Sequence, residues 1–400
     1  MDDTTTTSVL VAGAGPVGLA LAVRLAAAGV PHLVIERAAA PATTSRAAVV
    51  HARTLEVLDA LDVADALVAR GVVVPHFAVR DRDRTLLRVD FTGLPTRYPY
   101  TLMVPQDVTE QVLTETLEAR GGAVRHGHTL TGYDVDGDGR VVARVDGPDG
   151  RLTVRADHLV GADGMHSHVR ALAGIDFTGA AYAQSFVLAD VVLEADLPTD
   201  EVQLFFSPHG LVVVAPLPLG RRRIVATVDT APEHPGPEEI ASLLADRGPR
   251  SGVRVRELVW SSRFRVHHRL ARHYRRGPVL LAGDAAHVHS PAGGQGMNTG
   301  IQDAVDLGAR LAAVHDGEDP ALLDGYERDR RPVARQVVAV TDRMTRAATL
   351  SGVPARMRNV VLRGLDGLPP ARRAAAMNLS ELATPLPFGS DGTAVAVGSP

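Results

Sequence analysis

The start of the chain alternates short apolar runs with a helical pattern. Residues 8–12 are a continuous apolar run, residues 19–28 are rich in Leu and Ala, and residues 32–35 form a second apolar run. Short apolar runs are typical of buried strands, and Leu and Ala are strong helix formers. Because Gly29 stands where a helix would end, this order predicts a strand, a buried helix and a second strand. Such a βαβ unit opens a parallel sheet.

Helical and strand-like patterns continue to alternate through the rest of the chain. We expect helices at 54–70, at 107–120, from 237 and at 296–314, and strands within 72–88, 124–160, 186–228 and 279–282. This order predicts an α/β fold in which a nucleotide-binding domain, built from separated segments, is interrupted by a mostly antiparallel sheet. Beyond residue 354, Arg-rich helical stretches alternate with Pro and Gly, which predicts a helical tail.

The composition removes several kinds of chemistry. The 400 residues include no cysteine, and all 42 residues counted as Lys or Arg are arginine. The chain therefore has no disulfide, thiolate nucleophile or cysteine-ligated metal, and no lysine for a Schiff base or a Walker A loop. Codon bias is the simplest source of the missing lysine. Redox or group-transfer chemistry would need a cofactor that is held without these side chains.

Charge and hydropathy bear on partners and location. The net charge of −4 argues against a general nucleic-acid binder. The N-terminus lacks the positive region of a signal peptide, and the apolar stretch 9–30 contains Arg24 and is interrupted by Gly and Pro. We therefore expect a cytoplasmic protein with no nucleic-acid partner and no membrane partner.

The sequence GAGPVG at 13–18 has glycine at the three positions of the dinucleotide-binding fingerprint. It follows the first expected strand and opens the first expected helix, so a phosphate would meet the N–H groups of a helix N-terminus. Glu36 ends the next strand, where it is placed to bind a ribose hydroxyl. This motif alone does not distinguish FAD from NAD.

A second glycine-rich segment favours a flavin. Residues 280–287, LLAGDAAH, are a strand that ends in Gly-Asp, and residues 291–298, PAGGQGMN, open the long helix expected at 296–314. A carboxylate at a strand end, here Asp284, can bind a polyol hydroxyl, as the ribitol of FAD requires. Glycines at a helix entrance let the backbone approach a flat ring, and the helix dipole favours the negative charge of a reduced flavin.

Residues 157–164, DHLVGADG, are a third strand that runs into a glycine turn. In this order, GAGPVG, GADG and GD resemble the GxGxxG, DG and GD motifs of the class A FAD-dependent aromatic hydroxylases, the p-hydroxybenzoate hydroxylase-like flavoprotein monooxygenases. Residues 51–58 and 326–332 are most similar to the branch with polyketide hydroxylases and rifampicin monooxygenase. The resemblance covers roughly residues 8–345. Many members of that branch carry a thioredoxin-like C-terminal domain, in whose place we expect the short helical tail.

The resemblance implies a fold and a division into domains. We expect a Rossmann-like (GR2-type) FAD-binding domain with an inserted, mostly antiparallel β-sheet domain that binds substrate. The FAD-binding domain should comprise residues 1–70, 102–174 and 265–350, the substrate domain residues 71–101 and 175–264, and the C-terminal helical tail residues 351–400.

The resemblance also implies the cofactor site. Glu36 should bind the adenosine ribose, and Asp284 the ribitol. Arg46 and Gln106 should bind the pyrophosphate–ribitol region, and Asp163 should support the pyrophosphate region and nicotinamide use. The complete expected set is Gly13, Gly15, Pro16, Gly18, Glu36, Arg37, Arg46, Gln106, Asp163, Asp284, Pro291, Gly294, Gln295, Gly296, Met297 and Asn298.

The substrate site and the catalytic residues are less defined by the sequence. Phe77, Tyr100 and Phe206 are the expected walls of the substrate site. Side chains alternate along a strand, so Phe206 and its neighbour Phe205 cannot both point inward. No catalytic base stands out, and His51 and Arg46 are the candidates near the flavin.

The activity implied by the resemblance is that of a monooxygenase with non-covalent FAD and NAD(P)H as a transient reductant. NAD(P)H reduces the flavin, O₂ adds at its C4a carbon, and the hydroperoxyflavin oxygenates an aromatic or polyketide-type small molecule. A flavin-dependent oxidase, reductase or halogenase of the same fold, an NAD-dependent dehydrogenase and a non-catalytic FAD-binding protein remain alternatives. The single Trp260 lies outside the tryptophan motif of halogenases.

Two other patterns are weaker. The segment 134–139, DVDGDG, resembles half of a calcium loop, but Val145 stands where a bidentate glutamate is required. We expect a hairpin turn there. His287 and His289 have no third ligand at a diagnostic spacing, so no metal is expected.

Overall fold

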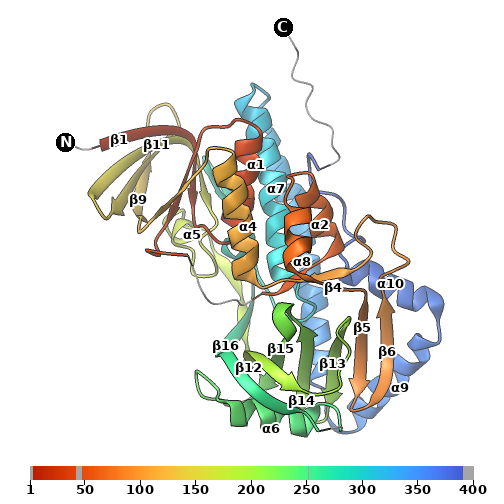
Figure 1. The fold of residues 1–400 in the computed structure, drawn as a ribbon. Helices are drawn as coiled ribbons and strands as arrows, with labels where there is room; N and C mark the ends of the chain where they lie inside the picture. The colour runs from red at the N-terminus through yellow and green to blue at the C-terminus, as the bar shows by residue number, and fades with distance from the viewer. Residues whose placement is uncertain (1–2, 42–46, 251, 391–400) are drawn as a thin grey trace.

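The computed structural model describes residues 3–41, 47–250 and 252–390. Two large sheets lie one above the other in Figure 1, with helices α1, α4 and α7 beside the upper sheet and α6 beneath the lower one. The α/β class predicted from the sequence is confirmed. In the described residues, no helix is both long enough and apolar enough to cross a membrane.

The upper sheet is built on parallel strands. Its order is β17 (Arg275–Arg276), β18 (Val279–Leu281), β11 (Gly150–Gly161), β1 (Asp3–Ala12), β2 (His32–Glu36) and β8 (Val124–His126). From β18 to β8 every neighbouring pair is parallel. β10 (Val141–Gly147) and β9 (Thr129–Val135) extend the long β11 as an antiparallel hairpin, which confirms the turn predicted at 134–139.

The register of the parallel strands sets where a ligand can bind. Ala12 pairs with both Gly161 and Ile35, and Gly161 pairs with Leu281. The carboxyl ends of β1, β2, β11 and β18 therefore lie at one edge of the sheet. In open parallel sheets, ligands bind at this edge.

The helices beside the upper sheet begin at that edge. They are α1 (Pro16–Ala27), α4 (Gln106–Ala119), α7 (Gly296–His315) and the short α5 (His168–Leu172). α7 packs along α1 and is buried along most of its length. The expected helices at 19–28, 107–120 and 296–314 are confirmed within a few residues of their ends.

The single helix expected at 54–70 is wrong. The chain forms α2 (Ala52–Asp59) and α3 (Ala64–Arg70), separated by Asp62 with φ +58°. The apolar spacing that suggested one helix is divided between two short ones, since a residue in the left-handed region ends a helix.

The lower sheet is antiparallel in its centre and contacts α6 on one face. Its order is β19 (His287–Val288), β16 (Arg254–Ala271), β12 (Phe177–Glu194), β15 (Arg221–Val228), β14 (Gly210–Pro216), β13 (Glu201–Ser207), β5 (His76–Asp81) and β6 (Arg84–Asp90). α6 (Pro237–Arg247) closes a small core of its own against this face. A third sheet, β3 (Val49–Val50), β7 (Thr101–Met103) and β4 (Val72–Val74), lies between the two large ones.

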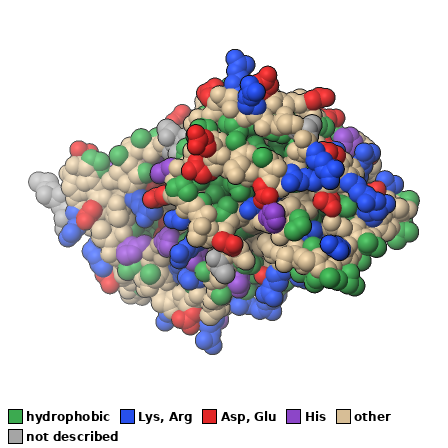
Figure 2. Space-filling model, turned by 90° about the horizontal axis from the view of Figure 1, so that it is seen from below, with side chains coloured by type: hydrophobic (Ala, Val, Ile, Leu, Met, Phe, Trp, Pro, Cys, Tyr) green, Lys and Arg blue, Asp and Glu red, His purple; other side chains and the backbone are tan. Residues whose placement is uncertain are grey.

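Three helices follow α7. They are α8 (Leu322–Ala348), α9 (Gly352–Asp366) and α10 (Pro369–Leu379). The predicted helical tail is confirmed by α9 and α10, which lie against β6 at the outer edge of the lower sheet. Seen from below, hydrophobic side chains gather at this end of the molecule (Figure 2).

Candidate active site

The GAGPVG turn joins β1 to α1 at the carboxyl edge of the upper sheet. Gly13 has φ +107°, and a Cβ on it would lie 2.4 Å from the carbonyl oxygen of Ala162. A Cβ on Gly18 would lie 1.9 Å from the carbonyl oxygen of Gly13. Backbone would have to move for either glycine to carry a side chain. These two glycines thus make the tight turn and the close contact between helix and strand.

Gly15 meets a different environment. No described heavy atom lies within 4 Å of the point where its Cβ would stand. Gly15 is the N-cap of α1, has no side chain that could cap the helix, and is followed by Pro16. The N–H groups at this helix end are therefore accessible to an anion such as a pyrophosphate.

The carboxylate of Glu36 is held beside this turn. Its Oε2 accepts a hydrogen bond from the N–H of Ala14, and its Oε1 accepts one from the N–H of Ala38, both at 2.9 Å. Each carboxylate oxygen has a second lone pair that can accept from a ribose hydroxyl. Arg37, the next residue, is exposed.

The Gly-Asp motif follows β18 at the same edge. Gly283 has φ +60°, and a Cβ there would lie 2.7 Å from a methyl carbon of Val17 in α1. This contact packs the turn against the first turn of α1. Asp284, in the same turn, is exposed at the edge where Glu36 also stands.

The glycine loop, residues 291–295, leads into the N-terminus of α7. Gly293 and Gly294 have φ of +83° and +67°. A Cβ on Gly294 would lie 2.8 Å from the Cβ of Val49, so the loop backbone packs directly against β3. Gln295 is the N-cap of α7 and makes no side-chain cap bond, which leaves the helix N-terminus facing the loop.

His51 and Asn298 hold the glycine loop in place. The N–H of His51 donates to Oδ1 of Asn298 at 2.8 Å. Nδ2 of Asn298 donates to the carbonyl oxygens of Val49 and Gly294, both at 2.8 Å. Nε2 of His51 lies 2.7 Å from the carbonyl oxygen of Gly293, so this nitrogen carries the proton. His51 and Asn298 are thus bonded to each other and make three further hydrogen bonds to the loop and β3, and we call these two residues the loop clamp.

Burial keeps the imidazole of His51 neutral. Desolvation lowers the pKa of His51 to about 4, against a smaller opposing effect of the Gly293 carbonyl. A neutral imidazole has one N–H, and Nε2 uses it on the loop. Of the two sequence candidates for catalysis, His51 thus holds the loop, and Arg46 lies outside the described residues.

Asp163 of the DG motif caps a helix. Its Oδ2 accepts hydrogen bonds from the N–H groups of His168 at 2.7 Å and Val169 at 3.1 Å, at the start of α5. Its Oδ1 is buried and has no partner among the described residues. The neighbouring Arg170 donates to the carbonyl oxygen of Ala285 at 2.8 Å, which ties the DG turn to the Gly-Asp turn.

A buried ion-pair network lies behind the Gly-Asp motif. Asp303 of α7 accepts from Nε2 of His287 and from Nε of Arg330, both at 2.7 Å. All three side chains are almost completely buried. Burial alone would raise the pKa of Asp303, but Arg330 and His287 bring it below its usual value. The network joins β19, α7 and α8. Among the described residues, no group of three or more His, Asp or Glu side chains is placed to hold a metal ion.

The segment after α10 contacts helix α7. Nε2 of Gln302, one turn beyond Asn298 in α7, donates to Oγ1 of Thr54 at 3.1 Å and also to Glu381. Glu381 has φ +61° and is 4% exposed, and burial raises its pKa to about 8. Arg53 donates to the carbonyl oxygens of Leu382 and Thr384, which fastens this segment to α2.

The remaining cofactor candidate from the sequence, Gln106, stands at the start of α4. Its Oε1 accepts from the N–H of Ala47 at 3.1 Å, and its Nε2 donates to Glu110 at 2.9 Å. Gln106 therefore fixes the backbone at Ala47 against the start of α4.

The three residues expected to line the substrate site differ in their burial and in the side chains they contact. Phe77 is buried, with its ring edge-to-face against Phe91 at 5.2 Å. Tyr100 is half-buried against Tyr98. Phe205 belongs to the small core under α6, whereas Phe206 lies on the opposite face of the sheet, beneath the guanidinium of Arg358 at 4.8 Å. The two neighbouring phenylalanines thus point to opposite faces, as expected.

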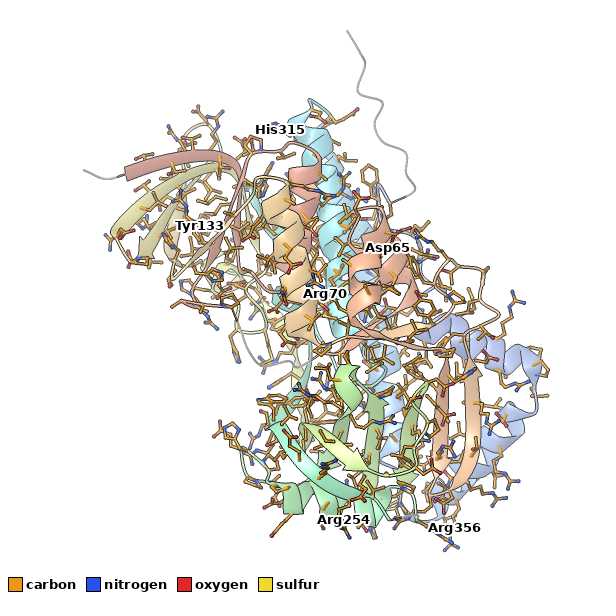
Figure 3. All side chains as sticks on the ribbon, in the orientation of Figure 1. Asp65, Arg70, Tyr133, Arg254, His315 and Arg356 are labelled. Carbon is orange, nitrogen blue, oxygen red and sulfur yellow. The ribbon has the colours of Figure 1, made fainter. Side chains whose placement is uncertain are left out.

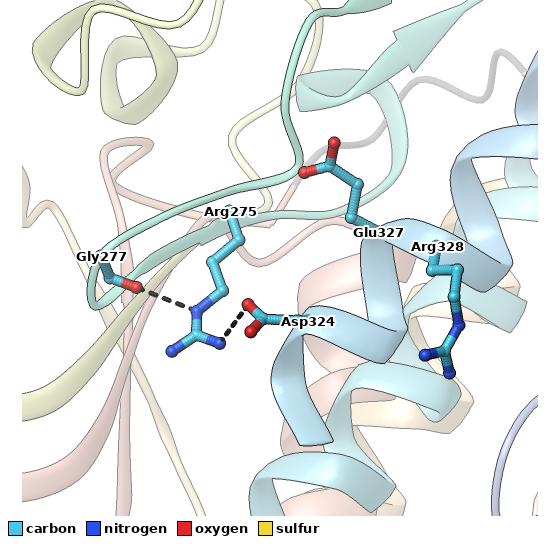
Figure 4. Close-up of a pocket in the computed structure, with 5 residues that line it drawn as sticks. All are labelled: Arg275, Gly277, Asp324, Glu327 and Arg328. Carbon is cyan, nitrogen blue, oxygen red and sulfur yellow. Dashed lines mark hydrogen bonds and ion pairs between the residues drawn. The ribbon is translucent and has the colours of Figure 1, made fainter. Parts of the chain in front are cut away.

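Side chains occupy the space between the ribbons throughout the molecule (Figure 3). A surface pocket between β17 and α8 is lined by Arg275, Gly277, Asp324, Glu327 and Arg328 (Figure 4). Arg275 donates to Asp324 at 2.7 Å, and Glu327 accepts from the N–H of Tyr274 at 2.9 Å. These bonds join α8 to β17, and we assign the pocket no ligand.

The residues at the carboxyl edge fit FAD. The open position at Gly15 fits a pyrophosphate, and the carboxylates of Glu36 and Asp284 fit the hydroxyl groups of the ribose and the ribitol. The glycine loop exposes backbone at a helix N-terminus. No lysine or cysteine is needed. Sequence reasoning missed Arg53, Arg170, Gln302 and Glu381, because their contacts join segments far apart in the chain.

Comparison with known families agrees with this geometry. The model of a family described as FAD binding domain matches residues 6–341. The chain belongs to this family. It is a member of the class A FAD-dependent aromatic hydroxylases, as the three glycine motifs indicated, and FAD is its cofactor.

Relatives and solved structures of the family are similar over most of the chain. A 6-methylpretetramide 4-monooxygenase from Streptomyces rimosus is 45% identical over 351 residues, which span 86% of this chain and 62% of that protein. The OxyS anhydrotetracycline hydroxylase from Streptomyces rimosus superposes with a TM-score of 0.81 at 36% identity, covering 96% of this chain and 78% of that one. The p-nitrophenol 4-monooxygenase PnpA from Pseudomonas putida superposes with a TM-score of 0.86 at 27% identity, covering 96% and 99%.

Proposed function

We propose that the chain is an FAD- and NAD(P)H-dependent monooxygenase that hydroxylates an aromatic or polyketide-type small molecule. The observation that carries the proposal is the loop clamp, because it fixes the backbone of the glycine loop at the N-terminus of α7, where a flavin ring would lie. The similarity to a 6-methylpretetramide 4-monooxygenase supports both the reaction and the class of substrate.

Different residues of the chain would bind different parts of FAD. Bound FAD supplies the electron transfer between NAD(P)H and O₂. Glu36 would bind the adenosine ribose, the N-terminus of α1 the pyrophosphate, and Asp284 the ribitol. Gln106 and Arg46 would bind between pyrophosphate and ribitol. The glycine loop would present N–H groups of α7 to the pyrimidine side of the ring and stabilise negative charge there.

The rest of the site follows from this placement. Substrate would lie between the glycine loop and the lower sheet, and Phe77 and Tyr100 are the aromatic walls we propose for it. Phe206 would need Arg358 to move from its ring. We propose that the FAD-binding, substrate and tail segments have the boundaries expected from the sequence. A cytoplasmic location would supply the NAD(P)H.

A labelling experiment tests the reaction. The purified chain, loaded with FAD, is given NADPH or NADH, ¹⁸O₂ and a panel of phenolic and polycyclic aromatic compounds. We expect at least one compound to stimulate NAD(P)H oxidation and to gain one ¹⁸O atom. Stimulated oxidation that yields only H₂O₂ would identify an oxidase or reductase instead. The Asp284→Ala variant, which should retain FAD poorly, is the control for oxygenation that does not depend on FAD bound at the site.

A further inference from the structure

Helix α9 is held to the protein by polar contacts. Nδ2 of Asn359 donates to Asp81 at 3.2 Å, and the carboxylate of Asp366 accepts from the N–H of Arg88 at 2.8 Å. Arg358 donates to the carbonyl oxygen of Ala347 at 2.8 Å. In the usual amphipathic helix these contacts would be made by apolar side chains. α9 instead turns much of its polar side toward β5, β6 and α8.

The apolar side of α9 faces outward. Val353 is 66% exposed, Met357 66% and Val360 69%, at the spacing that places residues on one face of a helix. Further large apolar side chains exposed on or next to this face are Val361, Leu365 and Leu368. Figure 2 shows hydrophobic side chains gathered at this end of the molecule, and we call the six residues the α9 ridge. A contiguous ridge of this kind marks an interaction surface.

The α9 ridge lies on a segment with an excess of positive charge. Between residues 350 and 379 the chain has five arginines and one acidic residue, Asp366. Arg356, Arg363 and Arg373 are exposed, and Arg356 projects from the lower edge of the molecule (Figure 3). Asp366 is already bound to the backbone of β6. The segment is thus cationic although the whole chain has a net charge of −4.

Charge selects among the partners that could cover this surface. A second copy of the chain, paired ridge to ridge, would bring two sets of exposed arginines together without acidic residues from this segment to oppose them. An anionic lipid surface matches both features, because apolar side chains enter the acyl boundary while arginines reach the phosphates.

We propose that the α9 ridge binds the surface of an anionic lipid bilayer. The contact is peripheral: the ridge lies in the plane of the interface, and no helix of the described residues is long and apolar enough to span the bilayer. This departs from the sequence expectation of no membrane partner, which rested on signal peptides and membrane spans and not on the exposure of a helix face. Apolar aromatic substrates partition into bilayers, so a surface-bound enzyme would meet them at higher concentration.

Vesicle binding tests the proposal. The FAD-loaded full chain is mixed with phosphatidylcholine vesicles, with or without phosphatidylglycerol, and bound protein is measured by flotation. We expect binding to the anionic vesicles, at least about tenfold weaker to neutral ones and weakened by salt. Met357→Glu and Arg356→Glu/Arg363→Glu should each lower binding about tenfold. Unchanged FAD content and melting temperature would establish that the variants fold.

A matched control separates the ridge from hydrophobic exposure in general. Leu219 is 86% exposed in a turn of the lower sheet, far along the chain from α9. Leu219→Glu should leave vesicle binding unchanged. The proposal is overturned if the chain binds neither vesicle, or if Met357→Glu and Leu219→Glu have equal effects. It is also overturned if light scattering shows a dimer that Met357→Glu converts to a monomer, because a second copy would then cover the ridge.

Discussion

The backbone N–H of His51 donates a 2.8 Å hydrogen bond to Oδ1 of Asn298, across a separation of 247 residues in the sequence. This bond joins the end of β3 to the first turn of α7 and is part of the loop clamp. The glycine loop has left-handed backbone at Gly293 and Gly294, which have no side chain to hold it in place. His51 and Asn298 supply side-chain hydrogen bonds to the backbone of both glycines.

Asn298→Ala should weaken FAD binding. The substitution removes two donated bonds and one accepted bond, each worth about 1 kcal/mol. We expect at least about tenfold weaker FAD affinity with retained folding, measured by fluorescence titration of the apoprotein. Asn378→Ala, in the exposed side of α10, removes a single bond to Ala374 and is the matched control. Equal FAD affinities for the two variants would mean that the clamp does not support the cofactor.

His51 should make folding sensitive to acid. The pKa of His51 is about 4 in the folded protein, below the ordinary histidine value of 6.5, so the unfolded chain binds the proton more readily between these values. The contribution of His51 to stability should therefore fall as the pH drops from 6.5 to 4 and change little below that, by a few kcal/mol at most. His51→Gln should show a shallower pH slope in urea unfolding. Part of the slope should remain, because burial also lowers the pKa of His289 to about 4. An identical slope in the variant would contradict this.

Glu381 should have the opposite dependence. Its folded pKa of about 8 lies above the ordinary glutamate value of 4.5, so the folded chain holds the proton more tightly. The stability that Glu381 contributes is then present at low pH and is lost as the pH rises from 4.5 through 8. Glu381→Gln should unfold at a higher temperature than the wild type at pH 9, with a much smaller difference at pH 5. A variant that is less stable at pH 9 would show that the charge is needed.

Asp303→Asn should destabilise the fold. The substitution leaves Arg330 buried with an uncompensated charge, which costs about 3–5 kcal/mol. The exposed Asp324, paired with Arg275, provides the control, since Asp324→Asn should cost under about 1 kcal/mol. Chemical unfolding of both variants measures the difference. Similar losses of unfolding free energy in the two variants would mean that the buried network contributes no more to stability than the exposed ion pair.

The sequence predicted the parts of the fold that depend on local pattern. The βαβ unit at the start, the glycine turns and α7 all follow from apolar runs and glycines that are adjacent in the chain. The threonines at 4–7 look like a low-complexity tract, yet they continue β1, because β11 is long enough to pair with them. β16 was missed since its exposed arginines hide the alternation of a strand.

The sequence predicted those parts of the site in which the residues that act together belong to one local motif. Glu36 was found because a strand end and a glycine turn are 18 to 23 residues apart in the same unit. The roles of Asn298 and Glu381 depend on partners in other elements, and no periodicity connects His51 with Asn298 or Gln302 with Glu381. α8 was missed as a helix because Pro332 lies inside it.

The FAD content of the purified chain tests the central claim most directly. The chain should be yellow, and acid should release about one FAD per chain, measured by absorbance after the protein is removed. Apoprotein should regain the spectrum when FAD is added, and Asp284→Ala should hold less. A colourless protein that cannot be reconstituted with FAD would contradict the account.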